Sequence, residues 1–224
     1  MISVIVPVLN EEARLHRQLR ALSQQGFGEL LVVDGGSTDR SPEIARSFPE
    51  LRLLSAPRGR ASQMNAGAAA ARGEILLFLH ADTTLPQRAA AHIEAALSAP
   101  EVIFGAFKLR TVRDEGPTPP WLRLADLRSR YSRLPYGDQA IFVRKEAFFA
   151  VGAYPDQPLM EDLELSRRLS ALGRYARAPA EVCASSRRLD NNLIGTTLFL
   201  NIAPTLYRLG VPPDRLARWY REVR

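Results

Sequence analysis

Two polar residues, His80 and Asp82, follow the apolar segment 75–79 and have the chemistry of a ligand site. The five apolar residues show no alternation, which indicates a strand buried on both faces of a parallel sheet. In open α/β sheets, ligands bind in the crevice beyond the carboxyl ends of the strands. Asp82 is thus a candidate ligand for Mg²⁺ or Mn²⁺, which prefer oxygen ligands together with phosphate. His80 is expected to point to the same side, as a metal ligand or as a hydrogen-bonding partner.

A further carboxylate, Asp34, ends the apolar segment 30–33 and is followed by two glycines. A carboxylate at a strand end can accept hydrogen bonds from a ribose or a base, and glycines let the backbone approach such a ligand closely. The alternative is a structural turn, because residues 37–39 (Ser-Thr-Asp) are good helix caps. The sequence alone leaves both interpretations open.

Arginines stand at the start of a predicted helix over residues 60–71. Arg58, Arg60, the helix dipole and free backbone donors can converge there on an anion, with Asn65 in the next turn of the same helix. A solvated basic turn is the alternative interpretation.

Two acidic residues, Glu161 and Asp162, begin a predicted helix over residues 161–172. Leucines at helical spacing form its apolar face, and arginines lie toward its end. Carboxylates in a first turn complement the helix dipole, so a structural role is sufficient to explain the pair.

The elements that must position these residues alternate along the first eighty positions. We predict strands over residues 4–6, 30–33, 51–54 and 75–79, with helices between them. Asn10 is expected to cap the first helix, with Glu11 and Glu12 in its first turn. Strands separated by helices predict a parallel, doubly wound α/β sheet.

The second half of the chain is less regular. We predict helices over residues 88–98, 121–131 and 193–209, strands over 102–112 and 140–143, a turn at 137–139 and a last short helix from Asp214. A turn-rich connection over residues 114–120 separates the two halves. We expect one α/β domain over residues 1–190 and a C-terminal helical extension over residues 191–224.

Composition and missing motifs exclude several classes of protein. Among the 224 residues, Cys183 is the single cysteine, so no intramolecular disulfide can form, which suits a reducing cytosol. No Gly-x-Gly-x-x-Gly follows the first strand and no Gly-Lys-Ser/Thr occurs, which disfavours a dinucleotide fold and a P-loop. The net charge of +6 comes mostly from dispersed arginines without interleaved aromatics, so nucleic-acid binding is disfavoured. Because no signal peptide begins the sequence, we expect a cytoplasmic protein.

Four stretches taken together resemble the family-2 glycosyltransferases of the GT-A fold. They are Val4-Ile5-Val6-Pro7-Val8-Leu9-Asn10-Glu11-Glu12, Val32-Val33-Asp34-Gly35-Gly36-Ser37-Thr38-Asp39, Leu79-His80-Ala81-Asp82 and Met160-Glu161-Asp162-Leu163-Glu164-Leu165. They occur in the family's order and spacing. The resemblance implies a GT-A nucleotide-sugar-binding fold, with a mostly parallel central sheet flanked by helices.

The resemblance also implies roles for individual residues. A nucleotide-sugar would bind around Pro7, Asn10, Glu11, Asp34, Arg58, Arg60, Asn65 and Ala81. The family's metal motif, Asp-x-Asp, reads His80-Ala81-Asp82, so Asp82 matches the acid that usually contacts Mg²⁺ or Mn²⁺ and His80 departs from the pattern. Asp162 of the Glu161-Asp162 pair matches the catalytic base. The Gln-x-x-Arg-Trp motif of processive members is absent, which favours a non-processive enzyme.

The implied function is a metal-assisted, inverting transfer of a sugar from a nucleotide-sugar to an acceptor hydroxyl. A sugar-phosphate nucleotidyltransferase on a related fold is one alternative, although its glycine-rich, basic N-terminal loop is absent. A nucleotide-binding module that has lost catalysis is another, and the departure at His80 gives it weight.

The tail has an amphipathic pattern. Residues 191–207 carry no formal charge, but they are too polar for a membrane span. Leu198, Ile202 and Leu206 share one helical face and arginines flank the segment, so it could rest on an anionic bilayer on the inner face of the membrane and bring the site to a lipid-linked acceptor. A helix that closes the core, or that makes a homodimer contact, is the alternative.

Overall fold

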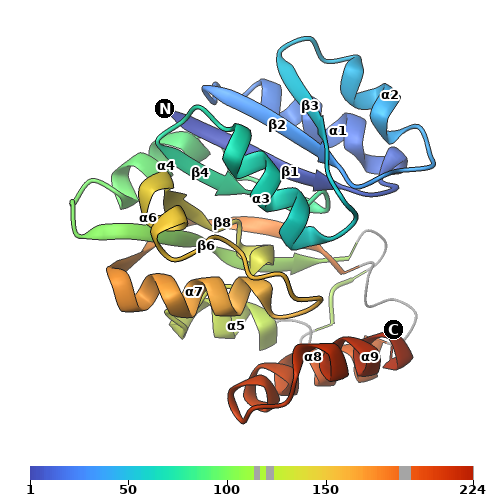
Figure 1. The fold of residues 1–224 in the computed structure, drawn as a ribbon, viewed down its shortest axis with the longest axis vertical. Coiled ribbons are helices and arrows are strands. Elements are labelled where there is room, and N and C mark those ends of the chain that lie inside the picture. The colour runs from blue at the N-terminus through green and yellow to red at the C-terminus, as the bar shows by residue number, and fades with distance from the viewer. Residues whose placement is uncertain (114–116, 120–123, 187–192, 224) are drawn as a thin grey trace.

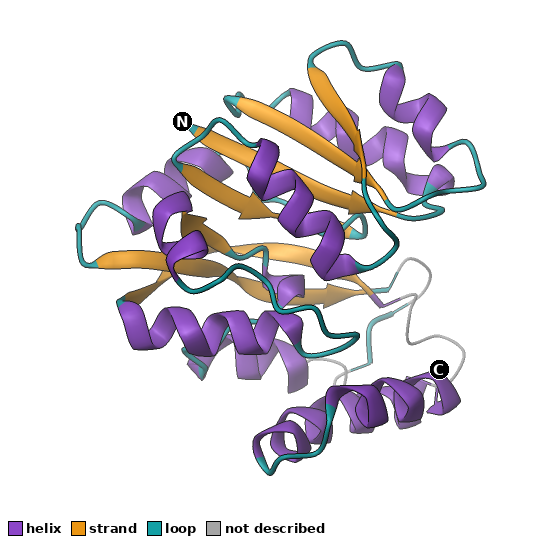
Figure 2. Cartoon of the chain, viewed as in Figure 1, coloured by secondary structure: helices purple, strands orange, loops and turns teal. Residues whose placement is uncertain are grey.

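The computed structural model describes residues 1–113, 117–119, 124–186 and 193–223. An eight-stranded sheet in the order β3-β2-β1-β4-β7-β6-β8-β5 runs through this part of the chain, with helices on both of its faces (Figures 1 and 2).

The N-terminal half is the parallel α/β unit that the sequence predicts. Strands β1 (Ile2–Val8), β2 (Glu29–Asp34), β3 (Leu51–Ser55) and β4 (Ile75–Phe78) are joined through helices α1 (Glu12–Ser23), α2 (Ser41–Arg46) and α3 (Arg60–Ala70). β1 pairs in parallel with both β2 and β4, and β2 pairs in parallel with β3. The carboxyl ends of these strands therefore lie along one rim of the sheet.

Successive residues of the buried strands supply two separate cores. Val4 and Val32 pack on the face that α1 covers, whereas Ile5 and Val33 pack on the face that α3 and α7 (Glu161–Leu172) cover. Because adjacent side chains of a strand point to opposite faces, a strand covered on both sides needs apolar residues throughout.

The C-terminal half makes the sheet mixed. It contains β5 (Thr83–Thr84), α4 (Ala89–Ala96), β6 (Val102–Val112), α5 (Leu124–Tyr131), the 3₁₀ turn η2 (Gly137–Gln139), β7 (Phe142–Arg144), α6 (Lys145–Ala150), α7 and β8 (Arg174–Ser185). β7 runs antiparallel to both β4 and β6, β8 runs parallel to β6, and β5 runs antiparallel to β8. The boundaries predicted for β6 and α7 match the structure, and the strand predicted over 140–143 begins two residues later.

Strand β8 was not expected from the sequence, since it lacks a clear alternation and contains Pro179. The register between β6 and β8 shifts between Ala106, opposite Arg177, and Lys108, opposite Glu181. The irregularity falls on the part of β8 that contains the proline, and bulges are where a sheet tolerates a residue without an N–H donor.

Two local predictions at the strand ends are wrong. Asn10 does not cap α1, whose N-cap is Glu11; Asn10 has a left-handed backbone (φ 55°) and its Oδ1 accepts a hydrogen bond from the Thr38 backbone N–H (2.8 Å). β4 ends at Phe78, so His80 and Asp82 lie in the following turn. Alternate residues point to the same side only within a strand, so that argument does not place the side chains of His80 and Asp82 on one side.

The C-terminal extension consists of α8 (Leu193–Arg208) and α9 (Pro213–Val223), which pack against each other. A small core of Met160, Leu163, Ala203 and Leu216 joins them to α7. The Tyr207 hydroxyl also donates a hydrogen bond to Oε2 of Glu164 on α7 (3.3 Å). The domain boundary predicted at residue 190 lies outside the described residues. Among the helices that the structure describes, none has the length and apolar character required to cross a membrane.

Gln63, on α3, fastens the ends of two strands. Its buried Nε2 donates hydrogen bonds to the carbonyl oxygens of Val8 and Val33, both at 2.8 Å. Gly35 makes this approach possible, because a Cβ there would lie 2.9 Å from Cδ of Gln63. The rim of the sheet is thus held by a side chain that reaches it from the covering helix.

Replacing Gln63 by leucine should lower the free energy of unfolding by about 1–3 kcal/mol, because buried carbonyl oxygens lose their donor. Urea denaturation followed by circular dichroism measures this change. The exposed residue Gln87 supplies the matched control, Gln87→Leu, which should be nearly neutral. Equal stability of the two variants would contradict the structural role of Gln63.

Candidate functional site

Two cavities meet at the carboxyl rim of the parallel strands. The first, here called the strand-end cavity, has a volume of about 400 Å³. It lies between the carboxyl end of β1 and the N-terminal end of α3. It is lined by Pro7, Val8, Leu9, Asn10, Glu11, Arg58, Gly59, Arg60, Gln63, His80 and Ala81. The structure therefore gathers in one place six of the eight residues predicted to bind a nucleotide-sugar.

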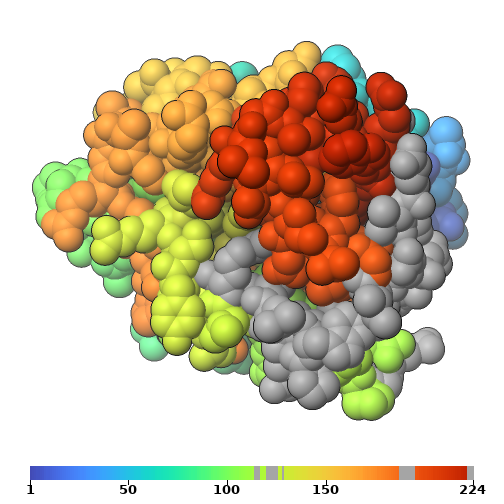
Figure 3. Space-filling view, turned by 90° about the horizontal axis from the view of Figure 1, so that it is seen from below, coloured from blue at the N-terminus to red at the C-terminus, as the bar shows by residue number. Residues whose placement is uncertain are grey.

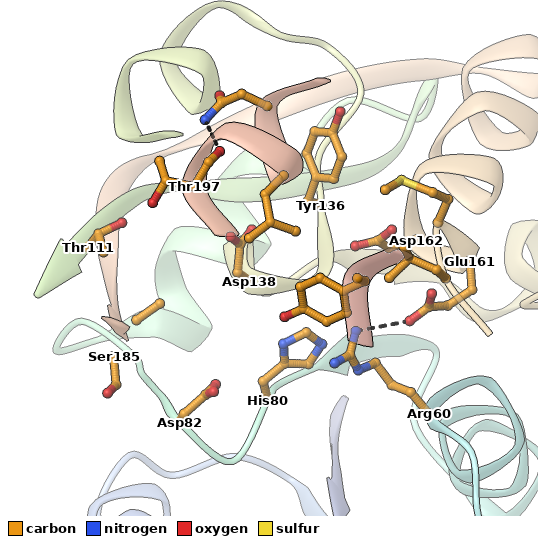
Figure 4. Close-up of a pocket in the computed structure, with 16 residues that line it drawn as sticks. Arg60, His80, Asp82, Thr111, Tyr136, Asp138, Glu161, Asp162, Ser185 and Thr197 are labelled. Atoms are coloured by element: carbon orange, nitrogen blue, oxygen red, sulfur yellow. Dashed lines mark hydrogen bonds and ion pairs between the residues drawn. The ribbon is translucent and has the colours of Figure 1, made fainter. Parts of the chain in front are cut away.

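The second, here called the inner cavity, has a volume of about 200 Å³ and lies under the C-terminal helices (Figure 4). Its polar end holds Arg60, His80, Asp82, Glu161 and Asp162. Leu159, Met160, Leu200, Tyr136 and Tyr220 supply apolar and aromatic walls. Arg60 and His80 line both cavities, so the two spaces share a boundary formed by these side chains.

An ion pair across this boundary joins α3 to α7. Nη1 of Arg60 lies 3.2 Å from Oε1 of Glu161, whose side chain is 3% exposed. Arg60, by contrast, is 38% exposed, because its guanidinium also faces the cavities. Glu161 therefore does more than complement the dipole of α7: it also pairs with a cation on another helix.

The pKa values of Arg60 and Glu161 at this boundary are shifted by burial and by neighbouring charges. Burial, followed by the charge of Asp162, raises the pKa of Glu161 above its ordinary value, although Arg60 opposes the shift. Burial lowers the pKa of Arg60, but the charges of Glu161, Asp162 and Asp82 outweigh it and raise this pKa. Arg60 therefore stays a cation and offers a fixed positive charge to both cavities.

Asp162 is held at the first turn of α7 with its carboxylate toward the inner cavity. Its Oδ2 accepts a hydrogen bond from the backbone N–H of Gly137 in η2, and its Oδ1 accepts one from Leu163, both at 2.7 Å. α7 begins after Met160, which has a left-handed backbone (φ 66°). The carboxylate is thus oriented by two backbone donors before any ligand arrives.

His80 packs directly beneath Gly137. A Cβ at residue 137 would lie 2.7 Å from Nε2 of His80 and 3.4 Å from Oδ2 of Asp162. The backbone of Gly137 does not have a positive φ, so another residue could adopt its conformation. Glycine is needed here because a side chain would collide with His80. In Figure 4, Arg60, His80 and Asp162 converge on one end of the inner cavity, and Asp82 lies beyond His80.

The residues around Asp82 fit a weakly held divalent ion. Asp82 lines the inner cavity close to His80, but no group of three or more acidic, histidine or cysteine side chains suited to a metal occurs within the described residues. Magnesium commonly binds through one or two carboxylates, with water and substrate phosphates completing its shell. The donor set therefore suits a metal that arrives with a phosphate ligand.

Two predicted ligand residues lie outside both cavities. Oδ1 of Asp34 accepts a hydrogen bond from the backbone N–H of Ser37, and its Oδ2 accepts one from Gly36, both at 3.1 Å. The Asn65 side chain forms a reciprocal pair with the backbone of Tyr154, at 2.9 and 3.0 Å. Both side chains are engaged in turn or helix-anchoring contacts in this structure.

Sequence reasoning missed Gly137 and Asp138 as parts of the site, and Tyr154 as a neighbour of Glu161 and Asp162. The first two were recognised only as a turn. Tyr154 packs edge-on against Phe78 (ring centroids 4.9 Å apart), and its buried hydroxyl has no hydrogen-bond partner among the described residues. Burial, followed by the charges of Asp162 and Glu161, raises its pKa well above the usual value. Only the three-dimensional packing brings these residues to α7.

The contact between Gly137 and His80 can be tested by a double-mutant cycle. Gly137→Ala should lower the free energy of unfolding by about 1–3 kcal/mol, because the added methyl group overpacks the imidazole. In the His80→Ala background the same substitution should cost clearly less, since the space is vacant. Urea denaturation of the four proteins gives the coupling, and an equal cost in both backgrounds would refute the contact.

Known proteins with similar sequences are glycosyltransferases. The sequence profile described as "Glycosyl transferase family 2" matches residues 3–154. A protein named "PGL/p-HBAD biosynthesis glycosyltransferase" from Mycobacterium bovis is 34% identical over 166 residues, which cover 69% of this chain and 63% of that protein. The beta-monoglucosyldiacylglycerol synthase of Synechocystis is 26% identical over 192 residues, covering 75% of this chain and 40% of that protein. The chain thus spans less than two thirds of the length of these relatives.

Solved structures share the fold. The mannosyltransferase PcManGT from Pyrobaculum calidifontis, in complex with GDP-Man and Mn²⁺, superposes with a TM-score of 0.68 at 22% identity, covering 98% of this chain and 68% of that one. TarS of S. aureus in complex with UDP gives a TM-score of 0.64 at 21% identity, covering 90% and 65%. The predicted GT-A fold is therefore confirmed, and its central sheet, predicted to be mostly parallel, is mixed. Given the profile match over two thirds of its length, this chain belongs to glycosyl transferase family 2.

Proposed function

We propose that this protein is an inverting, non-processive glycosyltransferase that moves a sugar from a nucleotide-sugar to an acceptor hydroxyl. The observation that carries the proposal is the junction of the two cavities, where Arg60, His80 and the oriented carboxylate of Asp162 meet. One cavity has the lining expected for a nucleotide donor and the other adjoins a carboxylate suited to remove a proton. A bisubstrate reaction needs such a pair of spaces.

The donor would bind in the strand-end cavity. Pro7, Asn10, Glu11 and Ala81 line the part proposed for the nucleoside, and Arg58 and Arg60 provide positive charge for the diphosphate. Asp34 and Asn65, engaged elsewhere in this structure, would support the pocket through the turn and the helix that they hold. The GDP-Man and UDP complexes of structurally similar proteins support a nucleotide-sugar as the donor.

Asp82, with His80 beside it, would hold Mg²⁺ or Mn²⁺ together with the donor diphosphate. Such an ion, when bound, neutralises charge that develops on the departing diphosphate. The Mn²⁺ in the complex of the Pyrobaculum mannosyltransferase supports the presence of a metal, while the choice between the two ions is part of the proposal.

The proposed chemistry is a single displacement at the anomeric carbon. Asp162 accepts the proton of the acceptor hydroxyl as that oxygen forms its bond to the anomeric carbon. The bond from this carbon to the diphosphate oxygen breaks on the opposite face, and its electron pair leaves with the diphosphate, so the configuration inverts. Arg60 stabilises the leaving charge, and Glu161 positions Arg60 through their ion pair.

The acceptor would occupy the inner cavity, with its hydroxyl at Asp162. The apolar and aromatic walls, among them Leu159, Leu200 and Tyr220, suit an acceptor whose hydroxyl is carried on an apolar body. The name of one relative, beta-monoglucosyldiacylglycerol synthase, refers to a glucosylated diacylglycerol, which supports a lipid-linked acceptor. A reaction in the cytoplasm, at the inner face of the membrane, is the setting that we infer.

Asp162→Asn should reduce sugar transfer by at least about 10²-fold, because the amide cannot accept the proton. Nucleoside diphosphate release from UDP-, GDP- and dTDP-sugars, measured with Mn²⁺ and a panel of acceptor alcohols, gives the rate. Asp156→Asn, at an exposed loop position, is the matched control and should retain activity.

One outcome would overturn the assignment of the base, and two others would overturn the function itself. Equal rates for Asp162→Asn and Asp156→Asn would remove Asp162 as the base. Pyrophosphate release from a nucleoside triphosphate and a sugar phosphate would identify a nucleotidyltransferase. Nucleotide binding by calorimetry without turnover on any acceptor would identify a silent binding module.

A metal held by Asp82 predicts opposite effects of two substitutions. Asp82→Asn should weaken Mn²⁺ binding in the presence of nucleoside diphosphate at least tenfold, because the carboxylate ligand is lost. His80→Asp, which restores Asp-x-Asp, should strengthen it. Calorimetric titration with Mn²⁺ measures both, with Asp214→Asn on α9 as the control, and unchanged affinity in Asp82→Asn would exclude this site.

A further inference from the structure

We propose that α8 and α9 form a docking surface for an anionic membrane. This inference rests on the proposed function in one respect: the reason for docking would be to present a lipid-borne acceptor to the inner cavity. Docking itself is a property of the surface and can be measured without catalysis.

An apolar stripe runs along the outer face of α8. Leu198 is 59% exposed, Ile202 is 44% exposed and Leu209, just beyond the helix, is 77% exposed. Positions separated by four and eleven residues fall on the same side of a helix. Trp219 on the neighbouring α9 is 37% exposed. Leu206, grouped with this stripe on the sequence pattern, instead packs against the small core that joins α8 to α7.

Basic residues accompany the stripe. Arg208, Arg215 and Arg218 are exposed, and Asp214 is the exposed acidic residue among the described side chains of positions 195–220. An exposed apolar strip with a tryptophan and arginines nearby matches the composition of helices that lie in a membrane interface, where apolar groups enter the headgroup region and cations contact anionic lipids. The charge favours an anionic bilayer over a neutral one.

The same two helices form a wall of the inner cavity. Thr197, Leu200 and Asn201 of α8 and Tyr220 of α9 line it, whereas Leu198 and Ile202 point outward. Figure 3 shows α8 and α9 together on one face of the molecule. A bilayer that contacts this face would therefore lie beside the proposed acceptor cavity, and an acceptor could enter it without leaving the interface.

A second copy of the chain fits this surface less well. A twofold interface places the same patch of both copies in contact, so the arginines of α8 and α9 would face an identical basic set. Like charges across an interface oppose association, and the net charge of +6 adds to the repulsion. An anionic membrane has the complementary charge.

Vesicle flotation tests the docking surface. The full chain is mixed with vesicles of phosphatidylcholine alone or with phosphatidylglycerol, and the bound fraction is measured at low and high salt. Wild type should bind the anionic vesicles and lose binding at high salt. The double variant Leu198→Glu/Ile202→Glu should bind at least about tenfold less, because carboxylates replace the inserting side chains.

Matched variants separate docking from general effects. Leu172→Glu changes an exposed leucine at the end of α7 and should bind like wild type. Arg215→Gln and Arg218→Gln should each weaken binding about fivefold, whereas Arg20→Gln and Arg46→Gln, at exposed positions of α1 and α2, should not. Circular dichroism confirms that every variant is folded.

The outcomes distinguish this inference from the proposed function. Asp162→Asn should bind vesicles like wild type, so loss of transfer with normal docking contradicts neither proposal. Equal vesicle binding by wild type and the Leu198→Glu/Ile202→Glu variant would overturn the docking surface. A wild-type dimer in sedimentation that this variant dissociates, without vesicle binding, would assign the stripe to a second copy and also overturn it.

Discussion

The contact between Arg60 and Glu161 is the interaction on which the site depends. It joins residues 101 positions apart and connects α3, from the parallel half of the sheet, to α7, from the mixed half. Because the carboxylate is almost fully buried, removal of Arg60 would leave an uncompensated charge inside the protein, which is far more costly than losing a surface ion pair. The pair thus holds Arg60 at the boundary that the two cavities share and keeps a positive charge there.

Helix α7 supports both the proposed chemistry and the C-terminal extension. Its first turn carries Glu161, Asp162 and Glu164, and Glu164 accepts hydrogen bonds from Arg167, Arg168 and Tyr207. The Arg167 hydrogen bond is the main cause that lowers the pKa of Glu164 to about 2, with Arg168 adding to it. Since Glu164 stays ionised above this value, the link from α7 to α8 persists over any ordinary pH.

The sequence predicted the elements with strong local signals and missed those that depend on distant partners. The apolar runs of β1, β2 and β4 and the leucine spacing of α7 were sufficient for their positions. Strand β8 was missed because Pro179 and mixed polarity hide it until β6 supplies a partner. Asp82 and Asp162, which the ordered motifs marked as candidates, both line the inner cavity, whereas Gly137 adjoins it only because His80 packs against it. Turn chemistry predicted the role that Asp34 has in the structure, as an acceptor for its own loop.

The close approach of Gly137 to His80 has a consequence for how such a chain can diverge. The imidazole fills the space that any other side chain at residue 137 would require. A mutation at residue 137 therefore becomes tolerable only after residue 80 has become smaller, and a return to a large residue at position 80 requires glycine to be restored first. The two positions are expected to evolve as a pair, and the order of substitutions matters because one of the two intermediates is overpacked.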